Sequence, residues 1–203
     1  DSAAKARGTA VHESMQKALD EGIGAVTNWP DRLDVGYTQD TLRFLLNFIE
    51  QHKADGLQAY TEHEMVINKD FKPTGWWDDD AYLRAKADFV FLQPGAFAHI
   101  GDWKTGKIYP DMEFQLQTEA LLAHVLYGVP VVTWGLYYLD QGTTKTGTID
   151  LRNGIAPVQD VLKTMRLMSE MINSGAPFPA TKNRFCRWCD WYHTSHCPQS
   201  RSW

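Results

Sequence analysis

An aspartate and a lysine stand two positions apart near the middle of the chain, in the stretch HIGDWKTGK. In a strand, side chains at positions i and i+2 point to the same face, so Asp102 and Lys104 would stand together while Trp103 faces the other side. A carboxylate beside an ammonium group can help to hold a divalent cation and to position an attacking water. An isolated D-x-K pair is nevertheless more often a solvated ion pair at a strand end.

A second carboxylate is expected close to this pair. Asp88 lies six residues before Pro94, and Asp102 lies seven residues after Gly95. A hairpin closed by this Pro-Gly turn would bring the two carboxylates near each other on neighbouring strands. Two carboxylates suit Mg²⁺ or Mn²⁺, which prefer oxygen ligands and usually retain waters. Such an ion polarises a phosphate and lowers the pKa of a bound water, which Lys104 would orient.

Two further polar side chains fall on expected helices. His12 follows Gly8 by four residues in GTAVHESM, where a neutral imidazole could supply a nitrogen ligand to Mn²⁺. Gln115 lies at the start of the helix in EFQLQTEALLAH, where its amide could hydrogen-bond a water, a ligand or a phosphate. Each of these residues, considered alone, is more often an ordinary helix residue. The functional prediction therefore depends on the order of all these residues along the chain.

In that order, G-x-x-x-H, a strand aspartate, D-W-K-T-G-K and a helix opening with Q-L-Q resemble the RecB-like branch of the PD-(D/E)XK nuclease superfamily. This branch includes nuclease domains of bacterial recombination helicases, CRISPR-associated exonucleases and phage nucleases. The resemblance runs from Gly8 to about Glu119, and D-W-K-T-G-K is its most specific part. It implies that Asp88 and Asp102 are the metal-binding acids and that Lys104 is the catalytic lysine.

The same resemblance assigns roles outside this central motif. It implies that His12 is the extra manganese ligand of the branch and that Gln115 begins its Q-x-x-x-Y motif. Glu119 stands where the family usually has tyrosine, so Gln117 is an alternative to Gln115. Glu64, in TEHEMVI, matches an acid often found on the family's first strand and would reach the metal through water; alternatively it is an exposed strand carboxylate.

The three cysteines of the chain fall in one short segment, FCRWCDWYHTSHC. They are Cys186, Cys189 and Cys197. This clustering predicts a metal or cluster site rather than a disulfide framework, although three reduced cysteines without metal are the alternative. The segment resembles the C-terminal iron–sulfur staple of the same nucleases, whose fourth cysteine lies upstream of the histidine motif. A 4Fe-4S cluster or structural zinc needs four ligands. The fourth would be a cysteine before Asp1, or His193 or His196, which would favour zinc.

Basic and aromatic side chains alternate around these cysteines. They are Lys182, Arg184, Arg187 and Arg201, with Phe185, Trp188, Trp191 and Tyr192. Such residues could contact a nucleic-acid backbone and stack on unpaired bases. The alternative is that the aromatic rings pack around the metal and the arginines form a solvated face.

The apolar periodicity of the chain predicts the helices and strands that carry these residues. It predicts helices over residues 3–20, 41–52, 111–127 and 158–173. It predicts strands over residues 59–68, 81–92, 96–106, 129–139 and 144–151. The first three strands should form an antiparallel meander in one central sheet of a mixed α/β domain. With the resemblance, this gives a restriction-endonuclease-like core over residues 1–175, with its central mixed sheet flanked by helices, and a cysteine-rich tail over 176–203 packed on it.

Composition limits the class of protein. The chain has 203 residues, of which 43% are hydrophobic and 22% are charged, which is enough to bury one sizeable core. No window has the ~18 apolar residues of a membrane span, and the N-terminal stretch lacks a signal-peptide core, so a cytoplasmic protein without membrane contact is expected. The net charge of −5 argues against coating nucleic acid by bulk electrostatics, but it allows an enzyme with an acidic metal site beside a basic groove.

Three functions compete. The leading one is a divalent-metal-dependent deoxyribonuclease, an exonuclease acting on DNA ends or single strands and leaving 5′-phosphates, in recombination, repair or phage DNA processing, with a recombination or helicase partner. The second is a catalytically weak DNA-binding module of the same fold in a recombination or CRISPR adaptation complex. The third is a zinc-binding interaction domain built around the cysteine tail.

Overall fold

The computed structural model describes residues 2–108, 112–175, 179–183, 185–192, 194 and 197. The chain divides into two compact units, residues 1–162 and 163–203, so one long helix begins in the first unit and continues into the second. Each unit is described by itself. The expected division at residue 175 stays a prediction.

All the expected helices and strands are present in the described residues. The α-helices are α1 (Ser2–Glu21), α2 (Val35–His52), α3 (Glu113–Tyr127) and α4 (Gln159–Ser174). The strands are β1 (Gln58–Asn68), β2 (Ala81–Gln93), β3 (Phe97–Lys104), β4 (Val131–Tyr138) and β5 (Thr143–Asp150). Helix α2 begins at Val35 rather than Thr41 because the Asp34 carboxylate caps it, accepting a hydrogen bond of 3.0 Å from the backbone N–H of Tyr37.

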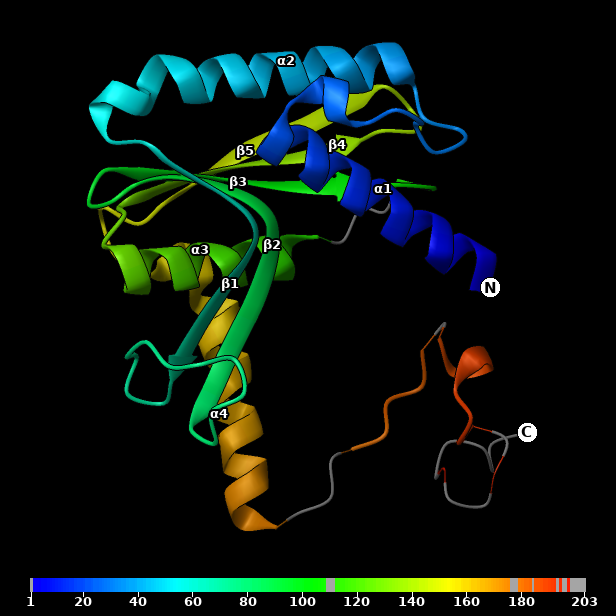
Figure 1. Ribbon diagram of the computed structural model, residues 1–203. Helices are drawn as coiled ribbons and strands as arrows, with labels where there is room; N and C mark the ends of the chain where they lie inside the picture. The colour runs from blue at the N-terminus through cyan, green and yellow to red at the C-terminus, as the bar shows by residue number, and fades with distance from the viewer. Residues whose placement is uncertain are drawn as a thin grey trace. The chain divides into compact units, whose positions relative to one another are not determined.

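The strands form one mixed sheet in the order β1-β2-β3-β4-β5. Strands β1, β2 and β3 pair antiparallel, which confirms the expected meander, and β4 pairs antiparallel with β5. Strand β4 lies parallel to β3, so the chain must cross over between them, and α3 makes this connection. Helices α1 and α2 cover one face of the sheet and α3 covers the other (Figure 1). The prediction of a mixed α/β core with helices on both sides is confirmed.

Trp103 faces the core beneath α1 and α2, as the alternation of the HIGDWKTGK stretch predicts. It is 2% exposed, and its ring centroid lies 4.9 Å from that of Phe89. Phe89 can cross β3 at this point because the partner there is Gly101, where a Cβ atom would lie 1.8 Å from Cζ of the phenyl ring. Since Trp103 and Phe89 fix one face of β3, Asp102 and Lys104 are turned to the other face.

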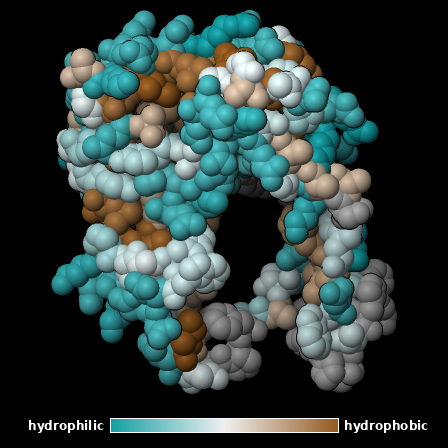
Figure 2. Space-filling view, viewed as in Figure 1, coloured by the Kyte–Doolittle hydropathy of each residue, from teal (hydrophilic) through white to brown (hydrophobic). Residues whose placement is uncertain are grey.

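His99, also in this stretch, belongs to the packing under α2. Its Nδ1 lies 2.9 Å from the Thr133 hydroxyl and its Nε2 lies 3.0 Å from the Tyr137 hydroxyl, and burial lowers its pKa to about 4. Hydrophobic residues show at the surface over α2 in the upper part of the view in Figure 2. Phe44 of α2 is 68% exposed. His99 is therefore a neutral, half-buried histidine that hydrogen-bonds within the packing under α2.

None of the helices in the described ranges combines the length and the apolar character needed to span a bilayer.

Candidate active site

Three carboxylates come from three neighbouring strands. The pairing registers place Asp88 of β2 between Glu62 of β1 and Asp102 of β3. The β2–β3 pairing ends just beside this row, and there the backbone N–H of Trp103 donates a hydrogen bond of 2.6 Å to Oδ2 of Asp88. The Asp88 side chain thus continues the link between the strands where their own ladder stops. The two expected acids, Asp88 and Asp102, lie close together.

His12 brings α1 to this row. Its Nδ1 lies 3.0 Å from Oδ1 of Asp88, and the hydrogen bond to Asp88 raises the pKa of His12 against the opposing effect of burial. Ligand atoms of His12, Glu62 and Asp88 all lie within 4.8 Å of one another. Within the described part of the chain, this is the one set of three or more metal-binding side chains so grouped. One nitrogen and two carboxylate oxygens suit Mn²⁺ or Mg²⁺.

The sequence did not predict Glu62 as an acid of the metal site; the family resemblance indicated Glu64 instead. Glu62 has a positive φ of 48°, a conformation that non-glycine residues rarely adopt. On one side of it the Thr61 hydroxyl donates to Asp20 of α1, and on the other His63 Nε2 lies 2.6 Å from the Tyr127 hydroxyl of α3. Thr61 therefore points toward α1 and His63 toward α3, although a regular strand would put both on one face. The turn of the backbone between them directs the Glu62 carboxylate to the metal-binding group.

Glu64 lies elsewhere. It is exposed and pairs in register with Lys86, and it does not belong to the group around His12. The family resemblance favoured Glu64, and simple alternation could not correct this, because it places Glu62 and Glu64 on the same face of a strand and does not allow for a residue in the left-handed region. No pattern in the sequence marks Glu62 as such a residue.

Lys104 and Gln115 hold Asp102 from two sides. Nζ of Lys104 lies 2.5 Å from Oδ2 of Asp102, and Nε2 of Gln115 donates a hydrogen bond of 2.9 Å to Oδ1. Asp102 is 7% exposed, and this burial raises its pKa, as does the nearby charge of Asp88. The structure brings Gln115 to Asp102, whereas Oε1 of Gln117 is buried without a hydrogen-bond partner among the described residues.

Glu119 stands behind Gln115, where the family resemblance leads one to expect tyrosine. Nε2 of Gln115 donates a second hydrogen bond of 2.9 Å to Oε1 of Glu119. Glu119 is 2% exposed, and burial raises its pKa to about 7. Because both neighbours of Nε2 are carboxylates that accept hydrogen bonds, the amide of Gln115 is held with its NH₂ group toward Asp102.

A comparison with protein families matches residues 1–197 to the PD-(D/E)XK nuclease superfamily. The chain belongs to this superfamily. Nucleases of this superfamily generally use Mg²⁺ or Mn²⁺, the cations that the donor set around Asp88 suits. No curated protein sequence matches the chain significantly. A solved structure, described as the crystal structure of SSO0001, is similar at 14% identity and a TM-score of 0.39, over 93% of this chain and 81% of the other.

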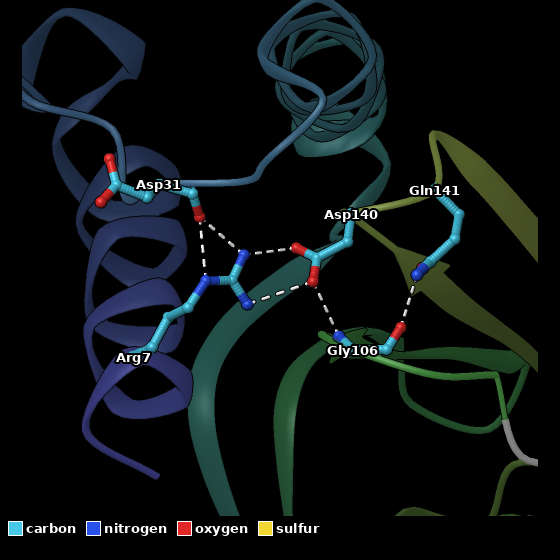
Figure 3. Close-up of polar contacts among 5 residues, drawn as sticks. All are labelled: Arg7, Asp31, Gly106, Asp140 and Gln141. Atoms are coloured by element: carbon cyan, nitrogen blue, oxygen red, sulfur yellow. Dashed lines mark hydrogen bonds and ion pairs between the residues drawn. The ribbon is translucent and has the colours of Figure 1, made fainter. Parts of the chain in front are cut away.

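A polar network fixes the loop that follows β3 in this PD-(D/E)XK chain (Figure 3). Arg7 of α1 donates to both carboxylate oxygens of Asp140 at 2.5 and 3.1 Å, and its Nε donates to the carbonyl of Asp31 at 2.9 Å. Oδ2 of Asp140 also accepts the backbone N–H of Gly106 at 2.8 Å, and Gln141 donates to the Gly106 carbonyl. The helix that carries His12 and the loop after Lys104 are thereby joined through the turn between β4 and β5.

The cysteines lie in the second unit. Cys189 is exposed, Cys186 and Cys197 are half-buried, and none of the three forms a disulfide within the described residues. The backbone N–H of Asn183 donates to Sγ of Cys186 at 3.2 Å, and the N–H of Cys189 bonds the carbonyl of Cys186 in a tight turn. Among the residues that the structure describes, the thiols do not form part of a metal-binding group. The other candidate ligands, His193 and His196, lie outside the described residues, as do Arg184 and Arg201.

Proposed function

We propose that the chain is a divalent-metal-dependent deoxyribonuclease of the RecB-like branch, an exonuclease acting on DNA ends or single strands. One observation carries the proposal: His12, Asp88, Asp102 and Lys104 come from widely separated positions and meet at one point of the fold. An isolated, solvated D-x-K pair at a strand end would not be expected to have a second acid and an imidazole beside it. The coarser conclusion, a nuclease fold, rests on the superfamily match.

Some of these residues would bind the cation, and others hold the metal ligands in position. His12, Glu62 and Asp88, with Asp102, would supply the nitrogen and oxygen ligands of the cation. When bound, the cation activates a water and polarises the scissile phosphate. Lys104 would orient the attacking water and offset the charge that develops on the phosphate. Gln115 fixes Asp102, and the Trp103 N–H fixes Asp88, so neither acid must reorganise during the reaction.

A cleavage assay tests this proposal. The native chain should degrade single- or double-stranded DNA with Mn²⁺ or Mg²⁺, while Asp102→Ala and Lys104→Ala should each lower the rate by about 100-fold or more. Lys145→Met, on the edge strand β5, is the matched control and should cut like the native chain. If the native chain leaves both DNA forms uncut with either ion, the enzyme is ruled out. DNA binding without cleavage would then identify the catalytically weak binding module.

We also propose a C-terminal metal site at Cys186, Cys189 and Cys197, either a 4Fe-4S cluster with an upstream cysteine or zinc with a histidine. Its support is the spacing of the three thiols and the tight turn between the first two. Iron and sulfide analysis of protein purified without oxygen, with its absorbance spectrum, separates the two metals. A colourless protein with one zinc per chain favours zinc, and a metal-free chain contradicts the site.

A recombination or helicase partner, a cytoplasmic location and a role in recombination, repair or phage DNA processing remain predictions of the family resemblance. Pull-down of the native chain with candidate helicases would test the first of these.

A further inference from the structure

A groove of about 540 Å³ opens beside the metal-binding group, between α1 and the β1–β2 hairpin. Besides His12, its walls are Gly8, Thr9, Glu13 and Gln16 from α1, and Glu62 and Lys86 from the hairpin. At Gly8 a Cβ atom would meet nothing within 4 Å, so this wall is open rather than filled by the protein. The groove therefore leads from solvent to the ligands of the cation.

Lys86 shares Glu62 with the expected metal ion. Its Nζ lies 2.8 Å from Oε2 of Glu62, and the Lys86 and Glu62 side chains are 43% and 27% exposed. Ion pairs this exposed are weak. A divalent cation ligated by Glu62 would compete with the ammonium group for the same carboxylate and would also repel it. Binding of the cation should therefore free Lys86.

The charge that a phosphate would meet in the groove also changes when the cation binds. Its charged walls, apart from His12, are the carboxylates of Glu13 and Glu62 and the ammonium group of Lys86. Without a cation this set carries more negative than positive charge and repels a phosphate. A divalent cation on Glu62 adds two positive charges beside the groove, and the released ammonium group is a donor for a phosphate oxygen.

We propose that Lys86 is a DNA-phosphate-binding residue that Glu62 restrains in the metal-free protein and releases when it ligates the divalent ion. The inference rests on the proposed nuclease function and deepens it, because it assigns this groove to the backbone of the DNA substrate. Lys86 then contributes to DNA binding in this groove only when the metal is bound.

The first experiment measures Mn²⁺ binding without DNA, by isothermal titration calorimetry on the full chain. Lys86→Met keeps the aliphatic stem and removes the charge that competes for Glu62. It should bind Mn²⁺ about two- to fivefold more tightly than the native chain, the range that an exposed ion pair allows. Lys145→Met is the control for net charge and should bind like the native chain. In a Glu62→Gln background the effect of Lys86→Met should disappear.

The second experiment measures DNA binding in a Lys104→Ala background, in which cleavage of the probe should be slowed by about 100-fold or more. A labelled single-stranded oligonucleotide is titrated with Mn²⁺ present or with EDTA. In Mn²⁺, Lys86→Met should weaken binding about three- to tenfold and lower the slope of log affinity against log salt by about 0.7, the value for one phosphate contact. In EDTA it should change little. Lys86→Arg should restore binding.

The outcomes separate this inference from the proposed function. If Lys86→Met leaves Mn²⁺ affinity unchanged or lowers it, the restraint by Glu62 is wrong. If it leaves DNA affinity and its salt dependence in Mn²⁺ unchanged, the phosphate contact is wrong. Either result can occur in a chain that still cuts DNA. A native chain that binds no Mn²⁺ contradicts both the inference and the proposed function.

Discussion

Nδ1 of His12 lies 3.0 Å from Oδ1 of Asp88, so a histidine of the first helix and an acid of the second strand form one hydrogen-bonded pair. The pair joins two candidate metal ligands, and the contact raises the pKa of His12. In the metal-free protein the imidazole is therefore protonated up to a higher pH than an ordinary histidine. Only an imidazole with a free ring nitrogen can ligate a cation, so the proton and the metal compete for the His12 imidazole.

This competition predicts a steep pH dependence of metal binding. Below the raised pKa of His12, Mn²⁺ affinity should fall by up to about tenfold per pH unit, and it should level off above that pKa. Calorimetry between pH 5.5 and 8.5 measures the profile. His12→Asn should bind Mn²⁺ more weakly and lose the part of the pH dependence that belongs to this group. An unchanged profile in His12→Asn would show that the imidazole is not a ligand.

The same pair has a stability signature. A histidine with a raised pKa in the folded state stabilises the metal-free protein below its unfolded pKa of about 6.5, and this contribution is lost as pH rises through the folded pKa. The free energy of unfolding in EDTA, measured by urea titration, should therefore decline over this interval in the native chain. In His12→Asn the decline should be smaller.

The Arg7–Asp140 network predicts an effect on catalysis from a residue that touches no metal ligand. Arg7→Met should lower stability by about 1–2 kcal/mol, because it removes four hydrogen bonds to Asp31 and Asp140 in a partly buried setting. It should also lower kcat more than it raises KM, since the loop after Lys104 is then less restrained. Thermal melts and steady-state kinetics measure the two effects.

Arg152→Met is the matched control for this substitution. Arg152 also binds an aspartate through its guanidinium group, but its partner is Asp150, two residues away, and its side chain is 66% exposed. Its removal should leave both the melting temperature and kcat unchanged. An Arg7→Met chain that behaves like Arg152→Met would show that the network does not position the loop.

The sequence predicted the helices and strands of this fold, and it predicted the site residues whose positions follow from strand pairing and alternation. The Pro-Gly turn fixed the register that brings Asp88 to Asp102, and i, i+2 alternation placed Lys104 beside Asp102 and Trp103 in the core. Alternation places Glu62 and Glu64 on the same face and does not choose between them, because the choice depends on the positive φ of Glu62. The contact between Arg7 and Asp140 depends on the packing of α1 against a distant turn, which no local pattern encodes.

The packing of Phe89 across Gly101 predicts a large difference between two glycine substitutions. At Gly101 a Cβ atom would lie within 2.0 Å of two ring atoms of Phe89, so Gly101→Ala should cost about 3 kcal/mol or more of stability and displace Asp102. At Gly8, in α1, a Cβ atom meets nothing within 4 Å, so Gly8→Ala should stabilise the helix by up to about 1 kcal/mol. Urea titration measures both, and equal stabilities would contradict the packing.

Substitution of Glu119 by glutamine should change stability and activity in opposite directions. Burial raises its pKa to about 7, whereas the ordinary value is 4.5, so the folded metal-free chain retains a proton that the unfolded chain has lost between these values. Its stability therefore decreases as pH rises through this range. Glu119→Gln removes this ionisation and should make the protein more stable at pH 8 than the native chain, by up to about 3 kcal/mol, with a smaller gain at pH 5.

The catalytic effect should be the reverse. A glutamine at position 119 can donate as well as accept, so the Gln115 amide is no longer held with its NH₂ group toward Asp102. The rate of DNA cleavage by Glu119→Gln should fall about tenfold. Glu119→Asp should retain more activity, because an ionised carboxylate, unlike glutamine, has no N–H group to donate to Gln115. In a Gln115→Ala background the substitution at Glu119 should have no further effect on rate. If the two losses multiply instead, Glu119 acts on the site by a route other than Gln115.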